Sequence, residues 1–493
     1  MRALFLVMDT VRRDYLTAYG NDWVQTPNIT RLSREGVTFD NHWVGSLPCM
    51  PARREFMTGR HNFLYRGWGP IEPFDDTLPR LLREEGVFTH LLTDHDHYFE
   101  LGGENYHTCF NTWDFFRGTE HDPWVSIVDR MALPEHLGKL SQQNWHNRQK
   151  QQTEEEFSGP RTCRSAVEWL EANKKADDWF LQVELFDPHE PFTCTDRWRE
   201  LYGDDWEGTL FDWPDYRVVD EDPGAIEHVR KCYAGLLSMT DHWAGKVLAK
   251  LEEIGVLDDT LVVYTTDHGT MLAEHQYWMK NYMPMFNEIV RIPLVLRLPR
   301  AASAGTRCAA LTQTIDVMPT FLEHFGAPTP PHVYGKSLFA ALRGETLRPD
   351  ALFGYFGKAT NITDGRHVYM RNPVQEDGGP LHAYTAMPVG GLNSWFPRES
   401  HERMEMGRYF GHTYNMPLYK IPTTGQVPVA APGEPSYLGR HQLFDTEADP
   451  RQEHPLDNPP LEAHFVGCLA AHFRTHEAPA EQYLRLGIPA PAA

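Results

Sequence analysis

The chain has 493 residues, enough for one large domain with a smaller one beside it. Its formal net charge of -22 at pH 7 argues against nucleic acid or an anionic membrane as a partner. The seven cysteines are scattered and include no CxxC pair, which argues against a disulfide framework or a zinc cluster.

The N-terminal apolar run ends at Asp9, which is too early for the hydrophobic segment of a signal peptide. No stretch of the chain is long enough and apolar enough to cross a bilayer. We therefore expect a cytoplasmic protein without a membrane partner.

Short apolar runs alternate with helical patterns over the first 330 residues. Predicted strands cover residues 3–8, 87–92, 179–186, 261–265 and 292–298, with a further one from Val37 towards Val44. Predicted helices cover 26–36, 78–86, 166–172, 226–254 and 320–325. This alternation predicts an α/β fold with a large, mostly parallel sheet between helices on both faces.

The pattern changes near residue 350. Strand-like pieces at 351–356 and 367–370 flank the turn signal Asp364-Gly365, the Pro- and Gly-rich stretch 373–440 is predicted to be largely loop-like, and 461–472 is a last helix. We predict that residues 1–348 form the α/β domain that carries the chemistry. Residues 349–493 then form a smaller C-terminal subdomain with a short antiparallel sheet and a terminal helix.

Ionisable residues follow five predicted strands, at the edge of the sheet where open α/β folds bind their ligands. An Asp that caps the next helix explains one such case but not five. The five segments are Asp9-Thr10, Cys49 to Arg53, Asp94 to His97, Asp187-Pro188-His189 and Asp267-His268-Gly269.

Asp9, Asp267 and His268 together make an oxygen-rich set with one imidazole. Such a set suits a hard divalent cation better than zinc or copper. We expect Ca²⁺, with Mn²⁺ or Mg²⁺ as the alternatives. The competing interpretation is a strand-end cap for Asp9 and a polar turn for the other two residues.

The segment Cys49-Met50-Pro51-Ala52-Arg53 gives the sharpest local signal. Pro51 suits the first turn of a helix, and residues 54–60 continue as that helix. Cys49 would then lie at a helix N-terminus, where free N–H groups favour negative charge, and Arg53 would add a fork of donors. For an isolated cysteine the alternative is a buried thiol.

These residues resemble the formylglycine-dependent type I sulfatases of the alkaline phosphatase superfamily. The family hallmark is Cys-x-Pro-Ser/Ala-Arg, which matches residues 49–53. The segments at 26–39 and 266–275, Lys280 with Arg291 to Leu294, and the stretch from Leu443 to Glu453 are also similar to family motifs. The resemblance spans nearly the whole chain.

The resemblance implies that a maturation enzyme oxidises Cys49 to formylglycine, which is held as its hydrate. One hydroxyl would attack sulfur and the other would then expel sulfate. The metal ligands would be Asp9, the modified Cys49, Asp267 and His268. Arg53 and Lys280 would stabilise charge on the transferring group, and His189 would protonate the leaving oxygen.

Two departures from the family pattern affect this interpretation. Asp9 is followed by Thr10 where many relatives carry a second acid, so the metal site would have fewer charged ligands and Thr10 would contribute little. The family segment Gly-Lys-Trp-His is replaced by Thr93-Asp94-His95-Asp96-His97. The sulfate-contacting lysine is thus missing, and His95 and His97 are candidates for the general base. The alternative, to which we give equal weight, is that His95 and His97 are only polar residues of the pocket wall or of a loop.

Three functions therefore compete. The first is a sulfatase acting on a sulfated sugar, aryl or alkyl ester. The second is a phosphonate monoester or phosphodiester hydrolase on the same scaffold. The third is a non-catalytic protein that binds anionic glycans. The partners expected for the first are a small-molecule or saccharide sulfate ester and the maturation enzyme. The oligomeric state is open, with a homo-oligomer as one option.

Overall fold

The computed structural model describes residues 1–375, 378–391, 393–423 and 440–490. Its centre is an eight-stranded sheet with the order β12-β2-β11-β8-β1-β7-β5-β6. Only β11 runs antiparallel to its neighbours. The predicted mostly parallel sheet is therefore confirmed. The strands are β1 (Arg2–Met8), β2 (Val37–Phe39), β5 (Phe88–Thr93), β6 (Thr112–Phe115), β7 (Trp179–Leu185), β8 (Thr260–Thr265), β11 (Leu294–Arg297) and β12 (Thr306–Cys308).

Strand β1 lies in the middle of this sheet and is buried on both faces. Leu4, Leu6 and Met8 belong to one hydrophobic core, whereas Phe5 and Val7 belong to the core on the opposite face. Successive side chains of a strand point to opposite faces, so a strand covered on both sides must be apolar at every position. This is why β1 appears in the sequence as a continuous apolar run.

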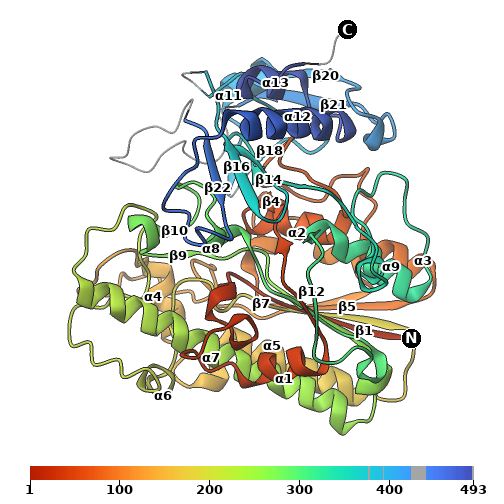
Figure 1. Cartoon of the computed structure of the whole chain (residues 1–493). Helices are drawn as coiled ribbons and strands as arrows, with labels where there is room; N and C mark the ends of the chain where they lie inside the picture. The colour runs from red at the N-terminus through yellow and green to blue at the C-terminus, as the bar shows by residue number, and fades with distance from the viewer. Residues whose placement is uncertain (376–377, 392, 424–439, 491–493) are drawn as a thin grey trace.

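Helices cover both faces of the sheet, as Figure 1 shows. Helices α1 (Pro27–Glu35), α5 (Ser158–Ala172) and α7 (Pro223–Glu253) pack on one face, and α2 (Cys49–Thr58), α3 (Leu78–Glu84) and α9 (Val317–Phe325) pack on the other. The longest helix, α7, begins where the side chain of Asp222 accepts hydrogen bonds from two backbone N–H groups, and Pro223 occupies its first position.

A second sheet, in the C-terminal part, has the order β22-β16-β15-β14-β4. Strands β14 (Ala351–Tyr355), β15 (Thr360–Thr363), β16 (His367–Arg371) and β22 (Gln442–Asp445) pair antiparallel. Helices α12 (Pro459–Thr475) and α13 (Ala480–Leu486) contribute to a core with this sheet. The predicted smaller antiparallel sheet and last helix are therefore confirmed, whereas the division at residue 348 stays a prediction.

Strand β4 (Ser46–Leu47) pairs parallel with β14, and so joins the second sheet to the segment just before Cys49. The expectation that the strand from Val37 to Val44 leads directly to Cys49 is wrong. Strand β2 ends at Phe39, and residues 42–43 pair with a separate short strand. Polar Asp40 and Asn41 interrupt the apolar run at this point, so the chain leaves the main sheet.

The prediction that residues 373–440 are largely loop-like missed a three-stranded sheet. Strands β17 (His382–Thr385), β20 (Glu405–Gly407) and β21 (Leu418–Pro422) pair antiparallel. These strands have three to five residues, so the surrounding Pro and Gly signals obscured them. Residues 376–377, 392 and 424–439 of this stretch lie outside the described residues. Among the described residues, no helix has the length and apolar character to span a membrane.

Candidate active site

The four predicted metal ligands come together at one edge of the main sheet. The ligand atoms of Asp9, Cys49, Asp267 and His268 all lie within 4.8 Å of one another, and all four residues are buried. Strands β1 and β8 run parallel and in register, with Val7 opposite Thr265. The residues that follow these two strands therefore emerge side by side, and Asp9 meets Asp267.

Cys49 is the first residue of α2. The prediction that Cys49 lies at a helix N-terminus is therefore confirmed. The helix ends at Thr58, two residues before the predicted end at Arg60, and Gly59 adopts a left-handed conformation there. The Sγ atom of Cys49 lies 3.1 Å from Nε2 of His268. Burial, and then the negative charge of Asp9, raise the pKa of the thiol well above its usual value. An unmodified Cys49 is therefore held as a thiol, which is a weak nucleophile.

Arg53 lies one helical turn after Cys49 and bonds to three buried carboxylates. Its Nη2 is 2.7 Å from Asp9 and its Nη1 is 2.6 Å from Asp267. Its Nε donates to Glu184 on β7. Sequence reasoning missed Glu184, because it lies within a strand rather than after one. The sequence did offer one signal, a charged residue within the mostly apolar run that forms β7, because a charged side chain is seldom buried without a partner.

The charges of this cluster fit a divalent cation. Three carboxylates face one guanidinium, so full ionisation leaves a surplus of two negative charges that a divalent metal would balance. Burial alone would raise the pKa of Asp9, but Arg53 and neighbouring histidines hold it well below its usual value. Burial lowers the pKa of His268, and a neutral imidazole is the form that binds a metal. Its Nδ1 lies 3.0 Å from the carbonyl of Gly269, which leaves Nε2 facing the cluster.

Lys280 and His189 form a second group beside the predicted metal ligands. The Nζ of Lys280 donates to Nε2 of His189 at 2.9 Å. It also lies 3.4 Å from Thr10 Oγ1 and 3.4 Å from Glu190 Oε2. Burial opposes a charge on Lys280, but Glu190 and the other nearby acids raise its pKa, so the ammonium group persists. Thr10, expected to contribute little, thus contacts this lysine.

Glu190 is a further site residue that sequence reasoning missed. Tyr216 donates a hydrogen bond to it. Although burial opposes its ionisation, His189, Lys280 and this hydrogen bond bring the pKa of Glu190 to about 2. The carboxylate is therefore ionised and holds Lys280 in place. Glu190 directly follows His189 in the sequence, which was the available signal. No local pattern could predict that Tyr216 would bond to Glu190.

The two histidines that replace the family lysine segment have different surroundings. His95 is fully buried, with Nε2 3.4 Å from Oδ2 of Asp9. The two ring nitrogens of His97 face Glu100 at 2.6 Å and Glu120 at 3.6 Å. Burial opposes a charge on His97, but Asp96, Glu100 and Glu120 raise its pKa to about 9. Burial and Arg53 lower the pKa of His95. His97 is thus a paired cation, whereas His95 is neutral.

Glu120 connects the two groups, since its other oxygen lies 3.7 Å from Nδ1 of His189. The structure therefore brings every predicted site residue into one buried region. One cluster surrounds the predicted nucleophile and consists of Cys49, Arg53, Asp9, Asp267 and His268. His95 contacts it through Asp9, Lys280 contacts it through Thr10, and His97 reaches His189 through Glu120.

Asp94, which is fully buried, and Asp187, which is partly buried, form an acidic pair with consequences for stability. Burial raises the pKa of Asp94 to about 7, and burial together with Asp94 raises the pKa of Asp187 well above its usual value. Because the folded state keeps these protons to a higher pH than the unfolded state, the pair makes stability fall as pH rises above about 4 and through the pKa of Asp94 at about 7. We expect Asp187→Asn to reduce the loss of unfolding free energy between pH 5 and pH 8 by up to about 1.4 kcal/mol for each pH unit over which the folded state retains the Asp187 proton.

Chemical denaturation of both proteins at a series of pH values measures this effect. The exposed Asp205 provides a control, and Asp205→Asn is expected to leave the pH dependence of stability unchanged. An Asp187→Asn protein whose pH dependence equals that of the wild type would show that the pKa of Asp187 is not raised in the folded state.

Known proteins resemble this chain over most of its length. The family model described as Sulfatase matches residues 2–327. The N-acetylglucosamine-6-O-sulfatase of Bacteroides thetaiotaomicron is 25% identical, over 77% of this chain and 78% of the relative. The multifunctional alkaline phosphatase superfamily protein PehA of Trinickia caryophylli is 27% identical, over 69% of this chain and 76% of the relative.

Two solved structures share the fold over nearly the whole length. The phosphonate monoester hydrolase of Agrobacterium radiobacter has a TM-score of 0.65 at 19% identity, covering 98% of this chain and 97% of its own. BT4656, solved in complex with its substrate D-glucosamine-2-N,6-O-disulfate, has a TM-score of 0.67 at 17% identity, covering 97% of this chain and 98% of its own.

Proposed function

Because this chain belongs to the sulfatase family of sulfuric ester hydrolases, we propose that it cleaves the sulfate ester of a sulfated saccharide, with formylglycine formed from Cys49 as the nucleophile. The observation that carries this proposal is the position of Cys49 at the N-terminus of α2, within 4.8 Å of the other three predicted metal ligands. The saccharide class is supported by the relative that acts on N-acetylglucosamine 6-sulfate.

Asp9, Asp267, His268 and the modified Cys49 would hold the metal, for which we propose Ca²⁺ because two carboxylates dominate the donor set. When bound, such an ion lowers the pKa of a nearby hydroxyl and neutralises sulfate oxygens. The hydrated aldehyde supplies a nucleophilic hydroxyl together with a second hydroxyl through which sulfate can be released. A formylglycine-generating maturation enzyme is therefore part of the proposal.

The residues of this chain orient the substrate and move protons. Arg53 fixes Asp9 and Asp267 relative to Cys49, so the predicted ligands are arranged before substrate binds. Lys280 is a buried cation next to this cluster, suited to sulfate oxygens. The hydrogen-bonded pair of Lys280 and His189 holds a proton where the leaving oxygen must be protonated.

We assign the general base to His95 rather than His97 on geometric grounds. His95 lies against Asp9, next to the nucleophile, whereas the nitrogens of His97 face Glu100 and Glu120. In this arrangement His97 and Glu120 position His189, and His95 receives the proton during release of sulfate.

The role of His189 predicts a dependence on the leaving group. We expect His189→Gln to lower kcat/KM by about 10²–10⁴-fold for an alkyl or sugar sulfate, whose alcohol must be protonated as it leaves. For 4-nitrophenyl sulfate we expect a much smaller loss, because nitrophenolate is stable without a proton. Steady-state kinetics with both esters measure the difference. An equal loss for the two substrates would show that His189 does not act as the acid.

The proposed function is tested first by the mass of the tryptic peptide that contains Cys49, from protein made together with a maturation enzyme. A mass that matches formylglycine supports the nucleophile. An unmodified thiol in protein that remains inactive after such co-expression would refute the mechanism and favour a non-catalytic protein that binds anionic glycans.

A phosphonate monoester hydrolase is the second candidate. It is favoured by the replacement of the family lysine segment at residues 93–97 and by the shared fold with the Agrobacterium radiobacter enzyme. Comparing kcat/KM for 4-nitrophenyl sulfate and 4-nitrophenyl phenylphosphonate separates the two. A higher value for the phosphonate would make this second candidate the principal activity.

A further inference from the structure

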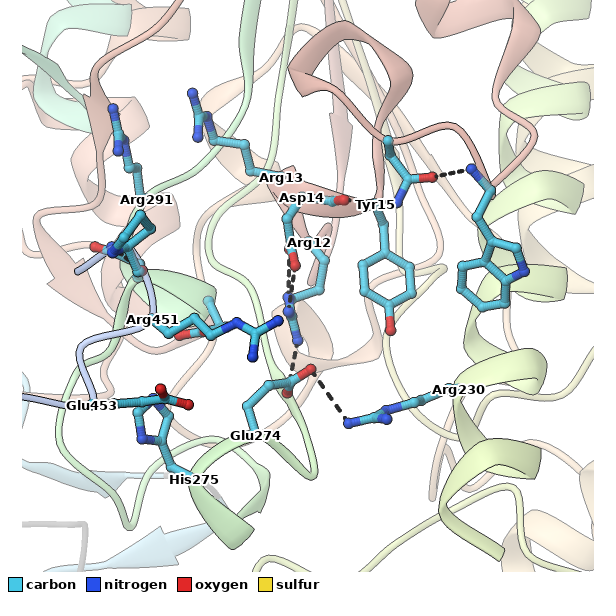
Figure 2. Close-up of a pocket in the computed structure, with 15 residues that line it drawn as sticks. Arg12, Arg13, Asp14, Tyr15, Arg230, Glu274, His275, Arg291, Arg451 and Glu453 are labelled. Atoms are coloured by element: carbon cyan, nitrogen blue, oxygen red, sulfur yellow. Dashed lines mark hydrogen bonds and ion pairs between the residues drawn. The ribbon is translucent and has the colours of Figure 1, made fainter. Parts of the chain in front are cut away.

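A cavity of about 690 Å³ lies apart from the Cys49 cluster, and none of the four predicted metal ligands lines it. Figure 2 shows its walls. They come from the loop after β1, from α7, from the loop after Leu272, from α8 (Asn287–Val290) and from residues 450–453. The volume is in the range of cavities that bind small molecules.

Five arginines line this cavity, in a chain with a net charge of -22. Two of them have acidic partners. Arg12 pairs with Asp14 at 2.6 Å and with Glu274 at 3.0 Å. Arg230 lies 3.8 Å from Glu274 and donates to the carbonyl of Leu272. Asp14 and Glu274 thus compensate these two arginines, which form part of the fold.

The other three, Arg13, Arg291 and Arg451, have no carboxylate within 4.0 Å in the part of the chain that the structure describes. Arg13 and Arg291 each donate through Nη2 to the same carbonyl, that of Asp40, at 3.1 Å. Their Nε atoms are buried without a partner among the described residues. Two guanidinium groups are therefore held next to each other, and neither forms an ion pair with a described carboxylate.

Electrostatics support the same conclusion. Burial and the charge of Arg13 lower the pKa of Arg291 to about 10. Asp40 opposes this shift, but its carboxylate already pairs with Arg307. Burial raises the pKa of Glu288, an acid of the cavity wall, to about 7. Figure 2 shows Arg13 and Arg291 at one end of the cavity and Arg451 extending towards its middle. An anionic ligand would relieve the repulsion between these cations.

Part of the wall is aromatic. Tyr15 and Trp23 pack edge to face, with ring centroids 5.8 Å apart, and the side chain of Trp23 is 40% exposed. An exposed aromatic ring suits the apolar face of a sugar, because its flat surface can be covered without the loss of a hydrogen bond. The cavity thus presents both arginines and an aromatic surface.

We propose that this cavity is a second binding site, for an anionic saccharide whose sulfate or carboxylate groups bind Arg13, Arg291 and Arg451 and whose ring packs against Trp23. The oxyanion class depends on the arginines alone, whereas the saccharide class rests on the proposed function. Arg12 lies three residues after Asp9, and Glu274 lies between His268 and Lys280 in the sequence. The second site therefore shares two loops with the site at Cys49, and a long saccharide chain would be retained near it.

The test is isothermal titration of Cys49→Ala protein, in an excess of Ca²⁺, with a heparin-derived octasaccharide. We expect a binding event that Lys280→Met leaves unchanged and that Arg451→Glu weakens at least tenfold. Arg451 and Trp23 are both exposed, so Arg451→Glu and Trp23→Ala are expected to fold. Arg398→Glu, at an 88% exposed arginine outside the cavity, is the matched control. Equal octasaccharide affinity of the Arg451→Glu, Trp23→Ala and Arg398→Glu proteins would overturn the proposal.

Two further arms separate the parts of the proposal. If inorganic sulfate binds this site as tightly as the octasaccharide and Trp23→Ala changes nothing, the saccharide class is wrong. Turnover of 4-nitrophenyl sulfate by Arg451→Glu, in protein that keeps Cys49, is expected to equal that of the wild type. Absence of any turnover in the wild type would refute the proposed function, while the titration would still report on the second site.

Discussion

Replacement of Cys49 by Ala is expected to lower kcat for ester hydrolysis by about 10⁴-fold or more. Alanine cannot be converted to formylglycine, so the variant lacks both the nucleophile and the group through which sulfate is released. Cys49 is also one of the four residues that face the predicted metal, so affinity for a divalent cation should fall as well. Initial rates with 4-nitrophenyl sulfate measure the first effect, and calorimetric titration of the metal-free proteins with Ca²⁺ measures the second.

The matched control is Cys163→Ala. Cys163 is likewise a fully buried cysteine in a helix, but it packs in the hydrophobic core of the opposite face of the sheet. This variant should lose a little stability, on the order of 1 kcal/mol, and keep its turnover. A Cys49→Ala protein that retains more than about a hundredth of the wild-type rate would sink the assignment of the nucleophile.

Arg53→Met is expected to produce the largest loss of stability among substitutions in the site. It leaves Asp9, Asp267 and Glu184 buried without their cation, and breaking a buried ion pair costs about 3–5 kcal/mol. Turnover should fall by about 10²–10³-fold or more, because the predicted ligands lose their fixed arrangement. Denaturant unfolding of wild-type and variant proteins in EDTA measures the change in free energy.

The metal provides an internal check on this explanation. A bound divalent cation would neutralise Asp9 and Asp267, so the destabilisation caused by Arg53→Met should be smaller with Ca²⁺ than with EDTA. Glu184 would remain unpaired, and the double variant Arg53→Met/Glu184→Gln should recover part of the remaining loss. Ca²⁺ is thus expected to offset the part of the lost stability that comes from Asp9 and Asp267, and Glu184→Gln the part that comes from Glu184.

Arg54→Met is the control for this experiment. The next residue in the same helix, Arg54, is also buried, but it pairs with Asp75 outside the site. Its removal should destabilise the protein by a similar amount whether or not metal is present. If Ca²⁺ changes the effects of Arg53→Met and Arg54→Met equally, then Arg53 has no special relation to the predicted metal ligands.

Local pattern in the sequence determined the α/β class, the two-sided burial of β1, and four of the five strand-end segments that build the site. These features depend on hydrophobic periodicity, on turn residues and on the short Cys49 to Arg53 motif, all of which involve neighbours in the chain. The identity of Asp9, Asp267, His268, His189 and Lys280 as site candidates followed from their positions after strands or from family resemblance, so it needed no knowledge of distances.

Tertiary structure decided the contacts on which the chemistry depends. Glu184 meets Arg53 from 131 residues away, and Lys280 meets His189 from 91 residues away. Strand β4 joins the second sheet by pairing with β14, which lies some 300 residues later in the chain, so no local pattern could predict this pairing. His95 and His97 look alike in the sequence, yet one lies beside Asp9 and the other between two carboxylates. Charge state and pairing of buried groups depend on desolvation and on neighbours distant in the chain, which local sequence pattern does not encode.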